Sequence, residues 1–196
     1  TILLPQVLAL NAKKRQEELL WVLQLAQDAG VIGNPDLSEE VSRARVFVVA
    51  LGTCPSDATV LDIGSGGGLP GLVIAHDRPD VHVTLIDRRE KRTDLLQRQA
   101  TRLRRHQPGL PIDVMCADIR ILQGKHTFDV ITARSFGPPE VVVESALPLL
   151  TPMGRLLVSE PPHSDGTRWR KALSSEISAS VELFSQDAAT VAVITR

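Results

Sequence analysis

A strand–loop–helix pattern over residues 59–77 constrains the fold of this chain more than any other feature. An apolar run ends at Asp62, and the loop that follows it, residues 63–68, is almost bare backbone. Pro70 then stands where a helix tolerates proline, because the first N–H groups of a helix have no internal partner. Such a loop would let a ligand lie against backbone and bind free N–H groups. A turn that only connects a strand to a helix is the alternative interpretation.

The spacing of the glycines distinguishes two kinds of nucleotide site. A dinucleotide-binding G-x-G-x-x-G pattern begun at Gly64 would need a glycine at Leu69, so that pattern fails. The observed order, D-x-G-x-G-x-G, resembles the first motif of class I S-adenosylmethionine (SAM) methyltransferases. In that resemblance Asp62 would hold the amino-acid end of the cofactor indirectly. The small residues that would let the backbone approach the cofactor are Gly64, Gly66 and Gly68.

A second apolar strand ends in an acid at Asp87. An acid about twenty residues beyond a glycine loop is well placed to bind ribose hydroxyls in nucleotide-binding folds. Asp87 could therefore accept hydrogen bonds from both hydroxyls, and Arg88 could lie beside the adenine. Asp87 could instead cap the next helix, and the two roles are compatible.

A third strand, residues 112–116, ends near Asp118. In a parallel sheet its end would lie beside the same crevice as the first two strands. Asp118 could accept a hydrogen bond from the adenine amino group, and Ile119 could cover the face of the ring. An ordinary turn aspartate is the alternative.

Composition sets limits on function. The 196 residues carry a formal net charge of −1, so nucleic-acid binding would need a local basic patch. Aromatic residues make up 3%, which supplies a base-stacking platform poorly, and core packing is the expected use of Phe136 and Trp169. Cys54 and Cys116 lack the pattern of a metal site or a disulfide framework. With no apolar run long enough for a bilayer and no secretory signal, we expect a cytoplasmic protein with no metal and no membrane partner.

Apolar strands and helices alternate along most of the chain. We expect strands near residues 59–63, 82–87, 112–116, 128–133 and 154–159. We expect helices near residues 2–29, 36–51, 70–77, 90–106, 139–150 and 166–176. This alternation predicts a parallel, doubly wound α/β sheet whose strands end at one shared edge.

The tail adds two strands near residues 179–184 and 190–195, and the short connection between them requires an antiparallel pair. Class I methyltransferases end with such a pair, whereas a dehydrogenase would normally continue with further βα units. We therefore expect a Rossmann-like class I methyltransferase fold with a mostly parallel seven-stranded sheet and a C-terminal antiparallel strand pair. Residues 1–52 would form an N-terminal helical cap on a SAM-binding domain of residues 53–196.

Four blocks of the chain resemble one particular family. Residues 61–71 read LDIGSGGGLPG, in which Leu-Pro-Gly is more specific than the general SAM loop. Residues 85–96 and 128–134 continue the match, as do residues 147–157. Together they resemble the bacterial small-subunit rRNA guanine-N7 methyltransferases, also called glucose-inhibited division protein B. The resemblance implies 16S rRNA or the small ribosomal subunit as partner and SAM contacts at Gly64, Leu69, Asp118, Ile119 and Arg134.

Arg134 is expected at the end of a central strand, where the substrate and the methyl group would meet. Its guanidinium could bind the SAM carboxylate or an RNA phosphate. A structural ion pair, for example with Asp62, is the alternative.

The chain also departs from the family. We find no asparagine-leucine-threonine stretch between its first helices, Ala117 stands where a basic residue often precedes Asp118, and Glu160-Pro161-Pro162 replaces lysine-glycine. Those positions would meet the RNA backbone, so SAM binding is better supported than the rRNA substrate. A basic helix face partly compensates, and it could meet phosphates or be a solvated surface. Its residues are Lys91, Arg98, Arg102 and Arg105, with Arg88, Arg89, Arg92 and Arg104 nearby.

These observations lead to the hypothesis of SAM-dependent methyl transfer to guanine N7 in 16S rRNA. Guanine N7 carries a free lone pair, so it needs no general base, and we assign no catalytic proton-transfer residue. Catalysis would rest on alignment of the reacting atoms. The alternatives are a class I methyltransferase acting on a small molecule or a protein, and a catalytically silent relative that binds SAM or RNA. A nicotinamide-dependent oxidoreductase is disfavoured by Leu69 and by the terminal strand pair.

Overall fold

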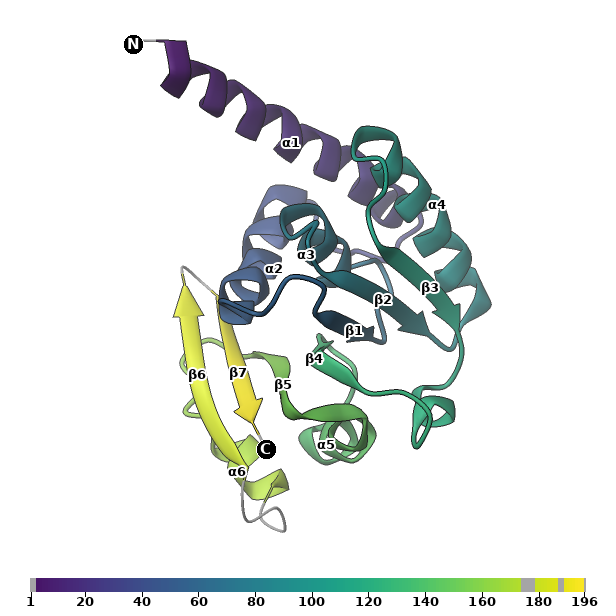
Figure 1. Cartoon of the computed structure of the whole chain (residues 1–196), viewed down its shortest axis with the longest axis vertical. Helices are drawn as coiled ribbons and strands as arrows, with labels where there is room; N and C mark the ends of the chain where they lie inside the picture. Colours follow the sequence, from purple (N-terminus) through teal and green to yellow (C-terminus); the bar gives the residue numbers. More distant parts are fainter. Residues whose placement is uncertain (1–2, 174–178, 187–188, 196) are drawn as a thin grey trace.

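The computed structural model describes residues 3–173, 179–186 and 189–195. A seven-stranded sheet with the order β3-β2-β1-β4-β5-β7-β6 forms its centre (Figure 1). The strands are β1 (Thr59–Ile63), β2 (His82–Asp87), β3 (Ile112–Cys116), β4 (Phe128–Ala133), β5 (Leu150–Glu160), β6 (Ser180–Gln186) and β7 (Ala189–Thr195). The α-helices are α1 (Leu3–Asp28), α2 (Leu37–Leu51), α3 (Gly71–Asp77), α4 (Glu90–His106), α5 (Pro139–Ala146) and α6 (Thr167–Ala172).

The predicted α/β fold is confirmed. Strands β1 to β5 pair in parallel, so their carboxyl ends lie at one edge of the sheet. Strand β7 runs antiparallel to both β5 and β6, as the short connection requires. Because β1 lies between β2 and β4, the strand order reverses there, and ligands bind open α/β sheets in the crevice at such a reversal.

Helices cover both faces of the sheet. Alternate residues of β1 face opposite sides, so Val60 packs in one core and Leu61 and Ile63 in the other. The first core contains the buried faces of α1 to α4, and the second contains those of α5 and α6. In Figure 1 the first part of α1 extends away from the sheet, while its later turns lie near α4.

Helix α2 begins where its sequence indicates. Asp36 caps it by accepting hydrogen bonds from the backbone N–H groups of Ser38 and Glu39, at 2.9 and 3.1 Å. Gly52, in the left-handed region at φ 57°, follows its last turn.

Three expected boundaries were wrong or could not be followed. The helix expected over 139–150 ends at Ala146 and continues as a 3₁₀ turn, η2 (Leu147–Leu149), because Pro148 cannot sit inside an α-helix. Strand β5 starts at Leu150 rather than near 154. Helix α6 ends at Ala172, and the rest of the segment expected to 176 lies largely outside the described residues.

Candidate functional site

A cavity of about 610 Å³ opens at the carboxyl ends of β1, β2 and β3. We call it the main cavity. Its volume lies in the range of roughly 300–1,000 Å³ that holds small molecules and cofactors. Five of the residues predicted to bind SAM line it: Gly64, Asp87, Arg88, Asp118 and Ile119.

Gly64 provides bare backbone at the wall of the main cavity. Its φ of +64° belongs to the left-handed region that glycine adopts without strain. A Cβ atom built on it would lie 2.7 Å from Cδ2 of Phe136, closer than real side chains approach. The aromatic ring of Phe136 therefore occupies the space that a side chain at Gly64 would need.

Asp87 ties the end of β2 to the glycine loop. Its carboxylate is 4% exposed and accepts a hydrogen bond of 3.2 Å from the backbone N–H of Gly66. The other oxygen accepts one of 2.9 Å from the N–H of Arg89, the residue that precedes α4. A carboxylate has about four acceptor positions, so Asp87 keeps capacity for a ligand in the cavity that it lines.

Asp118 and Ile119 form another part of the cavity wall. Asp118 caps the 3₁₀ helix η1 (Ile119–Leu122) by accepting from the backbone N–H of Arg120, at 3.0 Å. The Arg120 guanidinium also donates to the carboxylate, at 2.9 and 2.7 Å, and these bonds hold the pKa of Asp118 well below its ordinary value. Asp118 is therefore an anionic acceptor across the physiological pH range.

Asp62 lies behind the glycine loop instead of in the cavity. Asp62 is 1% exposed. Its carboxylate accepts a hydrogen bond of 2.7 Å from the Thr132 hydroxyl and one of 3.3 Å from the backbone N–H of Gly71. These bonds connect β1 to β4 and to the start of α3. Burial raises its pKa to about 6, although these hydrogen bonds act in the opposite direction.

The remaining residues predicted for the site do not line the main cavity. Gly66 reaches it only through its hydrogen bond to Asp87. A Cβ on Gly68 would lie 2.3 Å from Leu72 of α3, and the Leu69 side chain is buried in the first core, so neither residue belongs to the wall of the main cavity.

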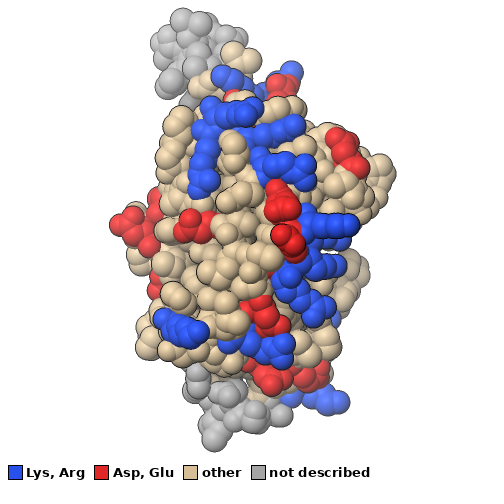
Figure 2. Space-filling model, turned by 90° about the vertical axis from the view of Figure 1, so that its right-hand side faces the viewer, with Lys and Arg blue, Asp and Glu red and all other residues tan. Residues whose placement is uncertain are grey.

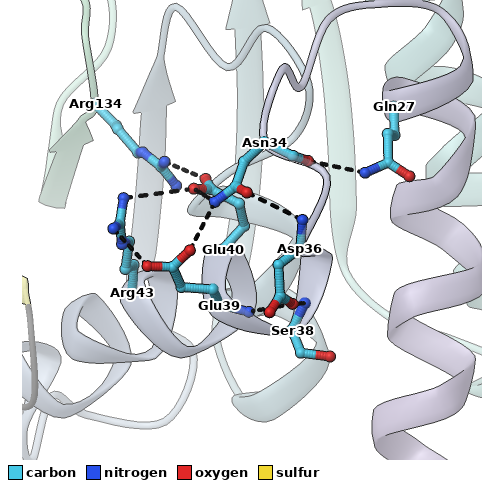
Figure 3. A network of polar contacts seen from close by, with 8 residues as sticks. All are labelled: Gln27, Asn34, Asp36, Ser38, Glu39, Glu40, Arg43 and Arg134. Atoms are coloured by element: carbon cyan, nitrogen blue, oxygen red, sulfur yellow. Dashed lines mark hydrogen bonds and ion pairs between the residues drawn. The ribbon is translucent and has the colours of Figure 1, made fainter.

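Arg134 pairs with Glu40 and not with Asp62 (Figure 3). The Oε1 atom of Glu40 accepts a hydrogen bond of 3.0 Å from the Asn34 side chain. Nη1 of Arg43 lies 3.7 Å from that same Oε1 atom. Burial acts to raise the pKa of Glu40, but the hydrogen bonds from Asn34 and Arg134 outweigh it and lower the pKa. The Nη1 atom of Arg134 is buried and has no hydrogen-bond partner in the described part of the chain.

A second cavity, of about 260 Å³, lies at the carboxyl ends of β4 and β5. Ser135 and Phe136 line both cavities, and Ser135 has a left-handed φ of +56°, which is uncommon outside glycine. Sequence reasoning missed Ser135, and it missed Arg168, which lines this cavity together with Glu160. An arginine eight residues after an acid carries no recognisable local signal.

The basic face of α4 is only partly available. Arg104 donates to backbone carbonyls of Leu110 and Ile112, and Arg102 lies 4.2 Å from the ring centre of Trp21. Lys91, Arg98 and Arg105 are exposed. Figure 2 shows the side of the molecule on which α4 lies, with Lys and Arg side chains gathered in two areas and acids between them.

No helix of the described residues combines the length and apolar character needed to cross a bilayer. No group of three or more His, Cys, Asp or Glu side chains among them is arranged to hold a metal ion.

The family model described as GidB, rRNA small subunit methyltransferase G, matches residues 22–181. Proteins named ribosomal RNA small subunit methyltransferase G match with 39% identity over 104 residues in Nocardioides sp. and 35% over 138 residues in Acidothermus cellulolyticus. These alignments cover 53% and 70% of this chain but 40% and 60% of the relatives, so the chain spans about half the length of the relatives it matches.

Solved structures share the fold at low sequence identity. An O-methyltransferase from Bacillus cereus in complex with SAH is similar with a TM-score of 0.67 and 14% identity, over 92% of this chain and 91% of that one. A ribosomal protein L11 methylase from Lactobacillus delbrueckii is similar with a TM-score of 0.62 and 15% identity, over 81% and 79%. The arrangement of strands and helices is therefore that of known methyltransferase structures.

Proposed function

This chain belongs to the GidB family of rRNA small subunit methyltransferase G proteins, and from that membership we propose that it transfers a methyl group from SAM to guanine N7 of 16S rRNA. The observation that carries the proposal within the structure is the position of Asp87. It lies at the end of β2, lines the main cavity and contacts the glycine loop through Gly66. An acid held in that way suits the ribose hydroxyls of an adenosyl cofactor.

The residues present fit SAM in three respects. Gly64 leaves backbone exposed where a side chain would collide with Phe136, so the cavity wall can approach a ligand closely. Asp118 offers an acceptor for the adenine amino group, and buried Ile119 offers an apolar surface for the ring. Arg88 lies on the same wall and would border the adenine.

Arg134 supports the same assignment, although it does not line the main cavity. Its buried Nη1 lacks a partner among the described residues, and a buried donor without a partner costs about 1–3 kcal/mol. A carboxylate such as the amino-acid end of SAM would satisfy it. Arg134 would then hold two carboxylates, that of Glu40 and that of the cofactor.

SAM supplies an electrophilic methyl group on a positively charged sulfur. The role of the protein is to bring guanine N7 into line with that group and to exclude water. Because N7 has a free lone pair, no side chain needs to remove a proton, and we assign none to that task. The exposed cations of α4 support binding to rRNA phosphates in the small ribosomal subunit, which would place the activity in the cytoplasm.

We further propose that residues 1–52 form a cap that supports residues 53–196. A Cβ on Gly67 would lie 2.8 Å from Ile32, which follows α1, so the cap packs directly on the glycine loop. The Gln99 side chain of α4 donates a hydrogen bond of 3.1 Å to the backbone carbonyl of Gly67. The cap would therefore fix the loop from behind.

Calorimetric titration with SAM, S-adenosylhomocysteine and NAD tests the cofactor. We expect micromolar binding of the two adenosyl compounds and none of NAD. Transfer of label from SAM to undermethylated small subunits, followed by mapping of the label in the rRNA, tests the substrate. SAM binding without transfer to subunits would favour a small-molecule or protein substrate, and absence of SAM binding would favour a catalytically silent relative.

A further inference from the structure

The second cavity shares a wall with the main cavity. Ser135 and Phe136, directly after β4, line both. If the main cavity holds SAM, as the proposed function requires, a group in the second cavity lies on the other side of that common wall. Its volume of about 260 Å³ falls below the roughly 300–1,000 Å³ of sites for larger ligands, so it suits a single ring system.

Glu160 is a buried anchor of this cavity. Its side chain is fully buried and accepts from the Arg168 guanidinium, from the indole N–H of Trp169 and from the hydroxyl of Ser164. The carboxylate is therefore occupied by groups of the protein itself. Glu160 stands where the family has lysine-glycine, and a free carboxylate there would repel the phosphates of rRNA. Because its charge is paired within the protein, this departure does not argue against an rRNA substrate.

Arg168 contributes a positively charged side chain to the lining of the second cavity. Its side chain is 43% exposed, although its Nε donates 2.6 Å to Glu160 and its Nη2 donates 3.1 Å to the carbonyl of Ser159. Its guanidinium also lies 5.0 Å from the ring centre of Trp169. Within the described residues Nη1 makes no hydrogen bond, so a firmly held guanidinium keeps free donors at the cavity.

We propose that the second cavity binds the purine base of the methyl-accepting nucleotide, that Arg168 donates to an acceptor oxygen of this nucleotide, and that Glu160 positions Arg168. The proposal rests on the methyl-transfer function given above. Phe136, half-buried between the cavities, provides the apolar surface next to the ring. A guanidinium fits either the keto oxygen of the base or a phosphate oxygen, since both accept from its N–H groups.

The test compares Arg168→Gln with the wild type and with Lys171→Gln, a control on the same helix whose side chain is exposed and does not line the cavity. We expect Arg168→Gln to raise KM for undermethylated subunits and to weaken subunit binding roughly 10- to 100-fold. The dissociation constant for SAM should stay within about twofold, because Arg168 does not line the main cavity. Lys171→Gln should change neither value.

The positioning role of Glu160 needs a second comparison. We expect Glu160→Gln to raise KM in the same direction, and the double variant with Arg168→Gln to be no worse for KM than Arg168→Gln alone. Additive losses would overturn the positioning role. If Glu160→Gln does not fold, Arg168→Lys replaces it, and partial recovery of KM relative to Arg168→Gln is then expected.

Subunit binding is measured with S-adenosylhomocysteine, which has no methyl group to transfer, so the result does not depend on turnover. Absence of methyl transfer by the wild type would refute the proposed function, whereas equal subunit affinity of the wild type and Arg168→Gln would refute this inference. The salt dependence separates the two acceptor oxygens. Log K falls as log salt rises. If Arg168 contacts a phosphate, this negative slope should be shallower by about one in Arg168→Gln than in the wild type, and if Arg168 contacts the base, the two slopes should be equal.

Discussion

Arg134, just after β4, donates a hydrogen bond to the carboxylate of Glu40 in α2, which lies 94 residues earlier in the chain. The Glu40 side chain is 6% exposed and that of Arg134 is 23% exposed. The pair therefore connects the N-terminal helices to a strand end beside the glycine loop (Figure 3). It leaves the buried Nη1 of Arg134 without a hydrogen-bond partner among the described residues.

Glu40→Gln should destabilise the protein by about 1–3 kcal/mol, because it leaves the guanidinium of Arg134 without its charged partner. Urea unfolding measures the change. The control is Glu39→Gln, one residue away, since Glu39 is half exposed and pairs with Arg43 on the surface. Equal stabilities of the two variants would show that the Glu40–Arg134 pair contributes nothing beyond a surface ion pair.

Asp62 should make stability depend on pH in an unusual direction. Its pKa is raised from 3.8 to about 6 by burial, so the folded state binds the proton more tightly than the unfolded state. The contribution of Asp62 to stability is therefore complete below pH 3.8 and is lost as the pH rises through about 6. Between pH 3.8 and about 6, the free energy of unfolding of the wild type should fall by roughly 3 kcal/mol relative to that of Asp62→Asn.

Urea unfolding of both proteins from pH 3.5 to 7.5 (roughly the window that linkage defines) checks this expectation. The difference between the two unfolding free energies is the relevant quantity, because the acids with lowered pKa values, such as Asp129, contribute equally to both proteins. A difference that does not change with pH would contradict the raised pKa of Asp62.

Gly64→Ala should weaken SAM binding, because the added methyl group would lie 2.7 Å from Phe136 at the wall of the main cavity. A matched control is available in Gly30→Ala. Gly30 has nearly the same φ, +65° against +64°, but apart from its neighbours in the chain no atom of the described residues lies within 4 Å of its Cβ position. Both variants should lose about 1–2 kcal/mol of stability from the left-handed backbone, and only Gly64→Ala should change the affinity for SAM. Similar SAM affinities in the two variants would place Gly64 outside the binding wall.

Asp87→Ala should weaken SAM binding by about 1–3 kcal/mol, since the ribose hydroxyls would lose their acceptor. Asp113→Ala provides the comparison, because Asp113 is exposed on the neighbouring strand β3 and does not line the cavity. Calorimetry with SAM and with S-adenosylhomocysteine measures both variants. An unchanged affinity in Asp87→Ala would remove this residue from the cofactor site.

Much of the fold follows from local sequence, and the reason is physical. Strand β2 and the loop after β1 are specified by apolar alternation and by glycines over a few residues, so the main cavity and the acid at Asp87 could be predicted. The pairing of Glu40 with Arg134 could not, because nothing within α2 or β4 indicates which residue the other will meet. The same holds for Arg168, whose position depends on how α6 packs beside β5.

Errors at element ends have a similar origin. The segment after α5 was predicted as helix because its residues are apolar, but Pro148 ends the α-helical hydrogen bonding and the chain continues as a 3₁₀ turn. Gly68 and Leu69 illustrate a different limit. Both stand at motif positions, yet Gly68 lies against Leu72 of α3 and Leu69 is buried in the first core, so neither lines the cavity.

Phe136 borders two cavities with one ring, and this has a thermodynamic consequence. If SAM binds in the main cavity and the acceptor nucleotide in the second, as proposed, any shift of the ring that one ligand favours would change the space offered to the other, and the two binding equilibria would be coupled. Coupling free energies are reciprocal: the factor by which a bound cofactor changes the affinity for the nucleotide must equal the factor by which the nucleotide changes the affinity for the cofactor. The sign of that cooperativity decides whether the two ligands bind in a preferred order.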